Sequence, residues 1–121
     1  FIAASIQGWV YCRDNFDECV DVVLDNGSTL GTSHQAWQLN EINGLIWPSP
    51  AGIGVMDEDL WVQTVTVAIE GQVIAEPPSM DAYRTDLVAA ASAMLMDMDM
   101  EIDLTGEMWE RVEVELQPGG E

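Results

Sequence analysis

Four carboxylates stand at alternate positions near the C-terminal end and could bind a metal ion. They are Asp97, Asp99, Glu101 and Asp103. This is the spacing of the first half of a calcium loop. The pattern fails further on, because an EF-hand loop needs glycine at its sixth place and glutamate at its twelfth, where this chain has Ile102 and Met108. We therefore interpret these carboxylates as a solvated acidic surface.

A series of methionines overlaps the same region and could supply soft sulfur ligands for copper. The series is Met94, Met96, Met98 and Met100. No cysteine or histidine lies nearby in the sequence to complete a copper site. We expect these flexible side chains to fill irregular gaps in the core instead, and no metal site is predicted.

Catalytic chemistry finds little support in the residues present. His34 is the only histidine, and the hydroxyls of Thr32 and Ser33 stand at a predicted helix start, where capping accounts for them. No G-x-S-x-G motif occurs. Two cysteines seven positions apart do not form a CxxC redox motif, and with one histidine they are too few for a zinc site. We predict no catalytic residue, no metal and no cofactor.

The elements that must position these residues are predicted to be about five helices. Apolar residues recur at helical spacing, and capping residues alternate with turns that contain glycine or proline. The predicted buried stripes are Ile2, Ile6, Trp9 and Val10; Leu39, Ile42 and Ile46; and Trp61, Val65, Ala68 and Ile69. The predicted starts are Asn15 with Glu18, Thr32 with Gln35, Asp57 and Thr85, and the predicted ends are Asp25-Asn26-Gly27-Ser28, Pro48-Ser49-Pro50 and Gly71.

The fifth helix is expected over residues 86–96, and a short strand follows it. Val112, Val114 and Leu116 alternate with glutamates, which is the period of a half-buried strand. The predicted fold class is therefore mainly α, with about five helices and a short C-terminal strand. Residues 1–96 are predicted to be a helical unit and residues 97–121 an acidic C-terminal extension. No run of apolar residues is long enough to span a membrane.

Charge excludes one class of partner. The chain has 22 acidic residues, three arginines and no lysine, for a net charge of -19. A phosphate backbone is bound by neutralising it with lysine and arginine, so nucleic acid is excluded and an anionic membrane face is disfavoured. The acidic excess is typical of a solvated surface. Adaptation to high salt, in which counterions screen the repulsion between carboxylates, is the alternative.

Four blocks of sequence carry a family resemblance that spans almost the whole chain. They cover residues 1–27, 34–48, 52–65 and 82–87, and read FIAASIQGWVYCRDNFDECVDVVLDNG, HQAWQLNEINGLIWP, GIGVMDEDLWVQTV and AYRTDL. Their order and spacing resemble the C-terminal part of substrate-binding proteins of ABC importers, in the NMT1/THI5-like group that includes nitrate, sulfonate, thiamine-precursor and riboflavin binders.

The resemblance implies a parent protein of two α/β lobes, with the periplasmic-binding-protein type II fold. It also implies an exported protein, periplasmic or at the cell surface and often a lipoprotein, which captures a small organic solute and delivers it to a membrane permease. The chain would then begin internally, within the second lobe. Two alternatives stay open: a part of a pyrimidine-synthesising THI5-like enzyme, and a free-standing helical interaction domain.

The resemblance also leads to a prediction for Cys12 and Cys19. Both positions are commonly small residues in a tight helix-helix contact of that family, so the cysteines are expected to form a disulfide, which would persist in an oxidising compartment. Two separate buried thiols are the alternative.

Among the five tryptophans, Trp9, Trp37 and Trp61 are predicted to anchor helix packing. Trp47 stands beside a proline-rich loop and is the candidate for a ligand contact in a cleft, the ligand-binding residues being otherwise unknown.

Overall fold

The protein is built from successive helices. Its structure is a computed structural model that describes residues 1–27, 29–99 and 101–120. Two predicted positions, Ser28 in a turn and Met100 in the methionine series, lie outside these residues. The elements are α1 (Ile2–Asp14), α2 (Phe16–Asn26), α3 (Thr32–Ile46), α4 (Glu58–Glu70), η1 (Met80–Ala82), α5 (Asp86–Met98) and η2 (Pro118–Gly120). Among the described residues there are five α-helices, which confirms the predicted mainly helical fold class.

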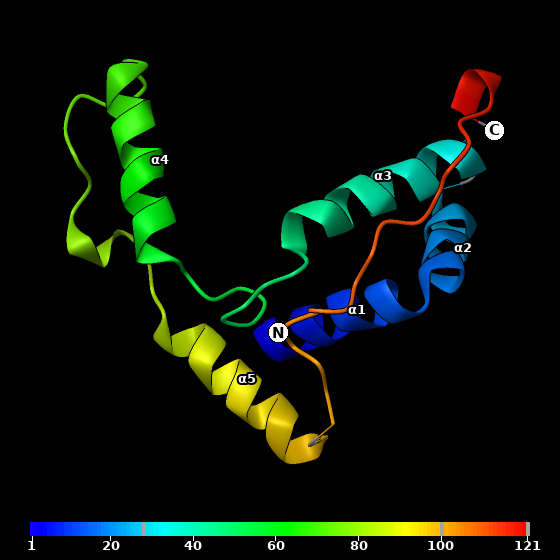
Figure 1. Ribbon diagram of the computed structural model, residues 1–121, viewed down its shortest axis with the longest axis horizontal. Coiled ribbons are helices and arrows are strands. Elements are labelled where there is room, and N and C mark those ends of the chain that lie inside the picture. Colours follow the sequence, from blue (N-terminus) through cyan, green and yellow to red (C-terminus); the bar gives the residue numbers. More distant parts are fainter. Residues whose placement is uncertain (28, 100, 121) are drawn as a thin grey trace.

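Three groups of elements are visible in the ribbon (Figure 1). Helix α2 packs against both α1 and α3, and α5 lies against α1. Helix α4 stands apart from this body, and residues 71–85 return along it before α5 begins. The last residues run back over α3, so that η2 packs against that helix. None of the helices among the described residues is both long and apolar enough to cross a membrane.

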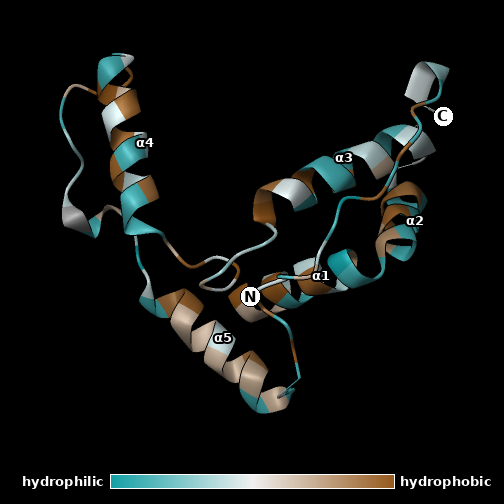
Figure 2. Cartoon of the chain, in the orientation of Figure 1, coloured by the Kyte–Doolittle hydropathy of each residue, from teal (hydrophilic) through white to brown (hydrophobic). Residues whose placement is uncertain are grey.

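The core forms where α1 meets α5, the loop after α3 and the C-terminal segment, which we define as residues 101–120. Its buried members are Ile6, Val10, Trp47, Ile53, Ala91, Leu95 and Leu104. The predicted stripe of α1 is confirmed, since Ile6 and Val10 are buried and Ile2 and Trp9 pack against the core. Large apolar residues such as Leu45, Val62 and Met98 remain exposed. Figure 2 shows how the hydropathy of the residues varies along each helix.

The predicted buried stripe of α3 is wrong in part. Leu39, Ile42 and Ile46 are only half-buried, whereas the buried residues of α3 are polar: Ser33, Asn40 and Asn43. The physical reason is the C-terminal segment, which crosses this face with backbone groups that need hydrogen-bond partners. Periodicity of apolar residues cannot reveal a helix face that is buried by an extended chain.

The predicted strand over Val112, Val114 and Leu116 is also wrong, because residues 111–117 are not in a strand. The backbone of this segment is bound by side chains of α3 in place of a neighbouring strand. Asn40 Nδ2 donates to the carbonyl of Val112 (2.9 Å), and Asn40 Oδ1 accepts from the amide of Val112 (3.1 Å). Ser33 Oγ accepts from the amide of Gln117 (3.0 Å). An alternating pattern forms a strand only where another strand is available for pairing.

Helix ends follow the sequence in some places and depart from it in others. Asp57 caps α4 through Oδ1, which accepts from the amide of Leu60 (2.9 Å), and Gly71 ends the same helix, as predicted. The predicted capping box at Asn15 and Glu18 does not form. Asn15 Nδ2 turns back to donate to the carbonyl of Tyr11 (3.0 Å), and Glu18 instead accepts from the Tyr11 hydroxyl.

The expectation that methionines fill the core is wrong for α5. Met94, Met96 and Met98 are exposed, with 57%, 51% and 67% of their surface accessible. Helix α5 buries only Ala91 and Leu95 on the side that faces α1, and the helix runs two residues beyond its predicted end at residue 96. Among the described elements only α1 packs against α5, so no second element covers the methionines.

The tryptophans predicted to anchor helix packing differ in their surroundings. Trp9 and Trp61 are half-buried. Trp37 is 39% exposed on α3, where its ring lies 5.7 Å from the ring of His34, so its predicted anchoring role is wrong. His34 is exposed on the same helix, as expected for a surface residue.

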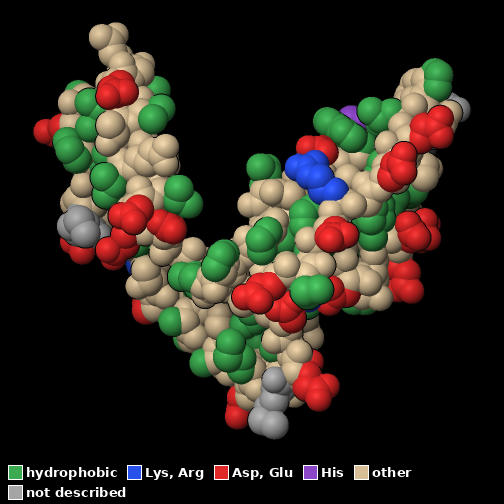
Figure 3. Space-filling view, in the orientation of Figure 1, with side chains coloured by type: hydrophobic (Ala, Val, Ile, Leu, Met, Phe, Trp, Pro, Cys, Tyr) green, Lys and Arg blue, Asp and Glu red, His purple; other side chains and the backbone are tan. Residues whose placement is uncertain are grey.

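Acidic side chains are spread over the visible face of the molecule (Figure 3). All three arginines form ion pairs with them: Arg13 with Asp14 and Asp103, Arg84 with Asp86, and Arg111 with Glu41. The net charge of -19 therefore leaves most carboxylates to repel one another.

We expect the melting temperature to rise measurably between low and near-molar sodium chloride. The Debye length falls from about 30 Å at 0.01 M to about 3 Å at 1 M, which screens the repulsion between carboxylates in the folded state. Circular dichroism melts across this range check the prediction. A flat or falling melting temperature would show that the carboxylates are too widely spaced to matter, and the high-salt interpretation would be abandoned.

Candidate functional site

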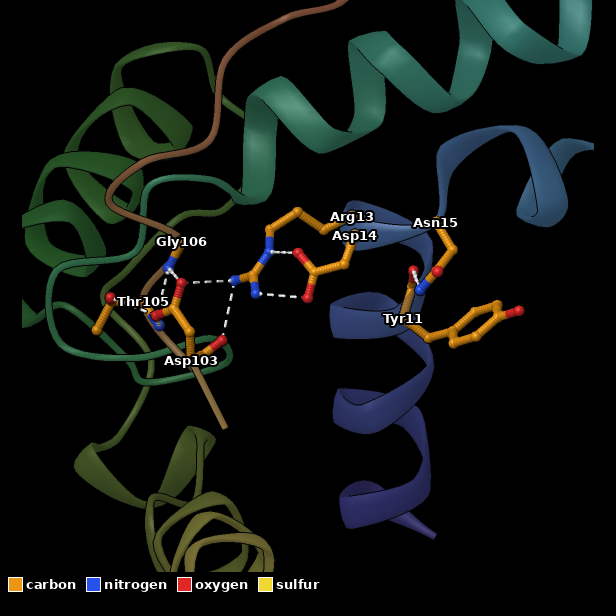
Figure 4. A network of polar contacts seen from close by, with 7 residues as sticks. All are labelled: Tyr11, Arg13, Asp14, Asn15, Asp103, Thr105 and Gly106. Atoms are coloured by element: carbon orange, nitrogen blue, oxygen red, sulfur yellow. Dashed lines mark hydrogen bonds and ion pairs between the residues drawn. The ribbon is translucent and has the colours of Figure 1, made fainter. Parts of the chain in front are cut away.

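The guanidinium of Arg13, in the last turn of α1, joins two segments that are far apart in the sequence. Its side chain is only 6% exposed. Nε and Nη2 donate to the two carboxylate oxygens of Asp14 (2.6 and 2.9 Å), and Nη1 donates to the carbonyl of Asp103 (2.9 Å) (Figure 4). Nη1 also lies 3.1 Å from Asp103 Oδ2. One cation thus joins the end of α1 to a loop 90 residues away.

Asp103 is held in place by its own turn as well as by Arg13. Oδ1 accepts from the amide of Thr105 (2.9 Å), the hydroxyl of Thr105 (2.7 Å) and the amide of Gly106 (3.0 Å). The hydroxyl of Thr105 is the largest cause that holds the pKa of Asp103 below its ordinary value of 3.8, with the Gly106 amide and the charge of Arg13 acting in the same direction. Asp103 is therefore ionised at neutral pH and orients the chain toward α1.

Gly106 is required by this turn for two reasons. Its φ of +62° lies in the left-handed region, which side chains other than glycine rarely adopt. A Cβ atom there would stand 2.6 Å from Cε3 of Trp47, too close for a real contact. The turn from Asp103 to Gly106 can therefore approach the indole ring only with glycine at this position.

Trp47 lies beneath this network and is 3% exposed. The guanidinium carbon of Arg13 stands 4.7 Å from the ring centre, a distance typical of a cation-π contact. The expectation that Trp47 faces a cleft is therefore wrong for this structure, because Arg13 and the Gly106 turn cover its ring. Its Nε1 and both amide atoms of Asn43, one turn earlier on α3, are buried without a hydrogen-bond partner among the described residues.

The Arg13 network is suited to holding the fold together. The hydrogen bonds that Arg13 donates to the Asp14 carboxylate are the largest cause that raises the pKa of Arg13, so the guanidinium keeps its charge. Its N–H groups already donate to the Asp14 carboxylate and to the Asp103 carbonyl. We conclude that this network fastens the C-terminal segment to α1 and to the ring of Trp47.

A disulfide joins the two cysteines next to this network. Cys12 in α1 and Cys19 in α2 are bonded, with 5.1 Å between their Cα atoms, across the break between the helices at Asn15. The bond fixes how α2 leaves α1. It also lines a groove of about 460 Å³ between α1, α2 and α3.

This groove and a second one form an apolar trough along α1. The first groove is lined by Trp9, Val20, Val23, Leu39 and Ile42 as well as the disulfide. The second groove, also about 460 Å³, is lined by Ile2, Ile6, Leu45, Ile46, Ile53 and Val88. Ser5 and Trp9 line both, so the two grooves adjoin. The trough can cover apolar surface of another element or molecule, and no pair of acid and base groups lines it.

The carboxylates singled out in the sequence do not converge. Asp99 Oδ1 accepts from the amide of Glu101 (3.0 Å) and Asp103 binds Thr105, Gly106 and Arg13, so two of them serve as turn caps. Within the part of the chain that the structure describes, no three His, Cys, Asp or Glu side chains are grouped so that they could hold a metal ion.

Sequence reasoning missed Arg13, which joins α1 to the Asp103 turn. The sequence held one indication of the loop that Arg13 binds. In the series Asp103-x-Thr105-Gly106 an aspartate can accept hydrogen bonds from the amides that follow it, which is typical of an ordered turn. Nothing in the sequence indicated that Arg13 and Trp47 would meet this loop. A comparison with protein-family models, curated proteins and solved structures found no match to the chain.

Proposed function

We propose that this chain forms the C-terminal part of the solute-binding protein of an ABC importer, in the group that resembles nitrate, sulfonate, thiamine-precursor and riboflavin binders. The observation that carries the proposal is the order and spacing of four sequence blocks, which together span residues 1–87. The whole protein would capture a small organic solute outside the cytoplasm and deliver it to a membrane permease. The chain itself would be a structural part of the second lobe and not an enzyme.

The uncovered apolar surface supports this proposal. Leu45 is 86% exposed in the trough, and Val62 and Val67 of α4 are 62% and 61% exposed. Contiguous apolar patches of this kind usually mark a surface that another element or partner covers. In a two-lobed receptor, the sheet and the remaining helices of the second lobe would lie against the trough and α4.

The disulfide supports the extracytoplasmic part of the proposal. A bond between Cys12 and Cys19 persists in an oxidising compartment and is rarely kept in the cytosol. A periplasmic or cell-surface protein meets this condition. A cytosolic THI5-like biosynthetic enzyme does not, and the described site residues supply no acid, base or nucleophile for such chemistry.

The mechanism proposed for the whole receptor is closure of two lobes about the solute. Ligand that binds the closed form more tightly raises its population, and the permease would recognise that form. The Arg13 network and the disulfide fit a role in keeping this part of the second lobe rigid during closure.

A free-standing helical interaction domain is the second candidate, and one observation favours it. The C-terminal segment supplies Leu104 to the core and binds α3 and Arg13, so part of the apolar surface is covered by the chain itself. Such a domain would fold cooperatively without further lobes.

The test compares the complete open reading frame that contains this sequence with the 121-residue chain alone. We expect the complete product to bind a pyrimidine, nitrate, an alkylsulfonate or riboflavin, with stabilisation of about 2.7 kcal/mol at a ligand concentration one hundred times the Kd. The chain alone should bind none of these and should bind a hydrophobic dye or self-associate. A chain that is monomeric, dye-silent and cooperatively folded would instead support the helical domain, and substrate turnover would overturn the transport proposal.

A further inference from the structure

A second site lies on the arm formed by α4 and residues 71–85, away from the Arg13 network. The returning segment brings Tyr83 against Trp61 of α4, with 4.9 Å between the ring centres and 58° between the ring planes. Both side chains are half-buried. Two aromatic rings at such an angle form adjacent walls of a corner.

The aromatic pair lines a groove of about 330 Å³. Its other walls include Val65 and Ile69 of α4, and Pro77 and Pro78 of the returning segment. Glu58, in the first turn of α4, lines the groove as well. The site therefore combines two aromatic rings, an apolar wall and one carboxylate, which is a combination that favours an organic cation.

The charge of the arm points to the same class of ligand. Residues 57–83 contain no arginine or histidine, and the whole chain contains no lysine. Their acidic residues are Asp57, Glu58, Asp59, Glu70, Glu76 and Asp81. The amino end of α4 carries only about half a positive charge from the helix dipole, which the three carboxylates at residues 57–59 outweigh. An anionic ligand would be repelled from this groove.

The arginine next to Tyr83 in the sequence does not occupy the groove. Arg84, the next residue, is bound to Asp86 by two hydrogen bonds of 2.9 and 2.5 Å. That carboxylate is the main cause that raises the pKa of Arg84, and the guanidinium lowers the pKa of Asp86 in turn. The only cation adjacent to the aromatic pair in sequence is thus engaged elsewhere.

We propose that the groove between α4 and residues 71–85 binds a small methylated ammonium cation, with Trp61 and Tyr83 against the methyl groups and Glu58 near the charge. A methylated ammonium is weakly hydrated and presents an apolar surface to Val65 and Ile69. Sodium and ammonium ions are compact and strongly hydrated, so they lose more on entering an apolar groove. This site does not depend on the proposed transport function.

The experiment is a titration of the full chain with tetramethylammonium chloride, followed by nuclear magnetic resonance at constant ionic strength. Sodium chloride and ammonium chloride replace the organic salt in parallel titrations. We expect saturable shifts of the Trp61 indole N–H signal, which a Trp61→Phe variant identifies, with a Kd in the millimolar range. The inorganic salts should give no saturable shift at this signal.

Three variants separate a built site from general attraction to an acidic protein. Glu58→Gln should weaken binding about threefold, since one charge near the cation is removed. Glu70→Gln removes the same charge from the far end of α4, outside the groove, and should leave the Kd unchanged. Tyr83→Leu should abolish saturation while thermal melts show that the body of the molecule stays folded.

Several outcomes overturn the proposal. Equal weakening by Glu58→Gln and Glu70→Gln would show that the cation is attracted only by net charge. Shifts of the same size with ammonium would show that the methyl groups are not recognised. Binding of a proline-rich peptide without binding of tetramethylammonium would assign the aromatic groove to an extended peptide instead.

Discussion

Replacing Arg13 by alanine is expected to lower the free energy of unfolding by about 3 kcal/mol, from lost charge-assisted hydrogen bonds and lost packing over an indole ring. Arg13 is buried, whereas Asp14 and Asp103 keep 52% and 47% of their side-chain surface exposed. Truncation therefore leaves the carboxylates in contact with water, and the main losses are the bond to the Asp103 carbonyl and the cover of Trp47. Chemical denaturation at neutral pH measures the change.

Arg84→Ala is the matched control. Arg84 also pairs with a nearby aspartate, Asp86, but its side chain is 66% exposed and it contacts no distant segment. We expect its replacement to leave the denaturation midpoint almost unchanged, because exposed ion pairs contribute little to stability. Equal effects of the two substitutions would mean that the link from Arg13 to the C-terminal segment does not stabilise the fold.

The effect of Arg13→Ala should also depend on pH in a defined direction. The pKa of Asp103 is lower in the folded chain than its ordinary value of 3.8. Its charge therefore stabilises the fold above that value, and the contribution is lost as the pH falls through the lower folded-state pKa. The difference between wild type and Arg13→Ala should shrink in the same acid range, leaving the parts that come from the bond to the Asp103 carbonyl and from packing on Trp47.

Removal of the disulfide is expected to have the second large effect. Cross-linking residues that stand seven positions apart restricts the unfolded chain, and the loop-entropy relation gives about 2.5 kcal/mol for a loop of this size. For a domain of this length the corresponding fall in melting temperature is about 10 °C. Melts of the oxidised and reduced protein measure it directly.

The variant Cys12→Ala/Cys19→Ala provides the control, since its melting temperature should not respond to reductant. Mass spectrometry of non-reduced protein should show a deficit of two hydrogens. A count of two free thiols in protein recovered from its native compartment would contradict both the bond and the proposed export. A reductant-sensitive melting temperature in the double variant would show that the reductant acts elsewhere.

The sequence by itself determined features that depend on neighbours a few residues apart. The stripe of α1 around Ile6 and Val10, the cap at Asp57 and the stop at Gly71 all follow from helical spacing and from hydrogen bonds within one turn. Interactions of this kind need no knowledge of how the chain folds back on itself. The expected bond between Cys12 and Cys19 came instead from the family resemblance.

Only the tertiary structure decided which polar groups are buried and which apolar ones are not. Asn40 is buried because its amide binds both backbone groups of Val112, and residues 111–117 are not a strand because a helix face, not another strand, receives them. Arg13, Trp47 and Asp103 form one network from three distant parts of the sequence. Local patterns carry no information about contacts across 72 or 90 positions, because the partner of a polar group is chosen by the path of the whole chain.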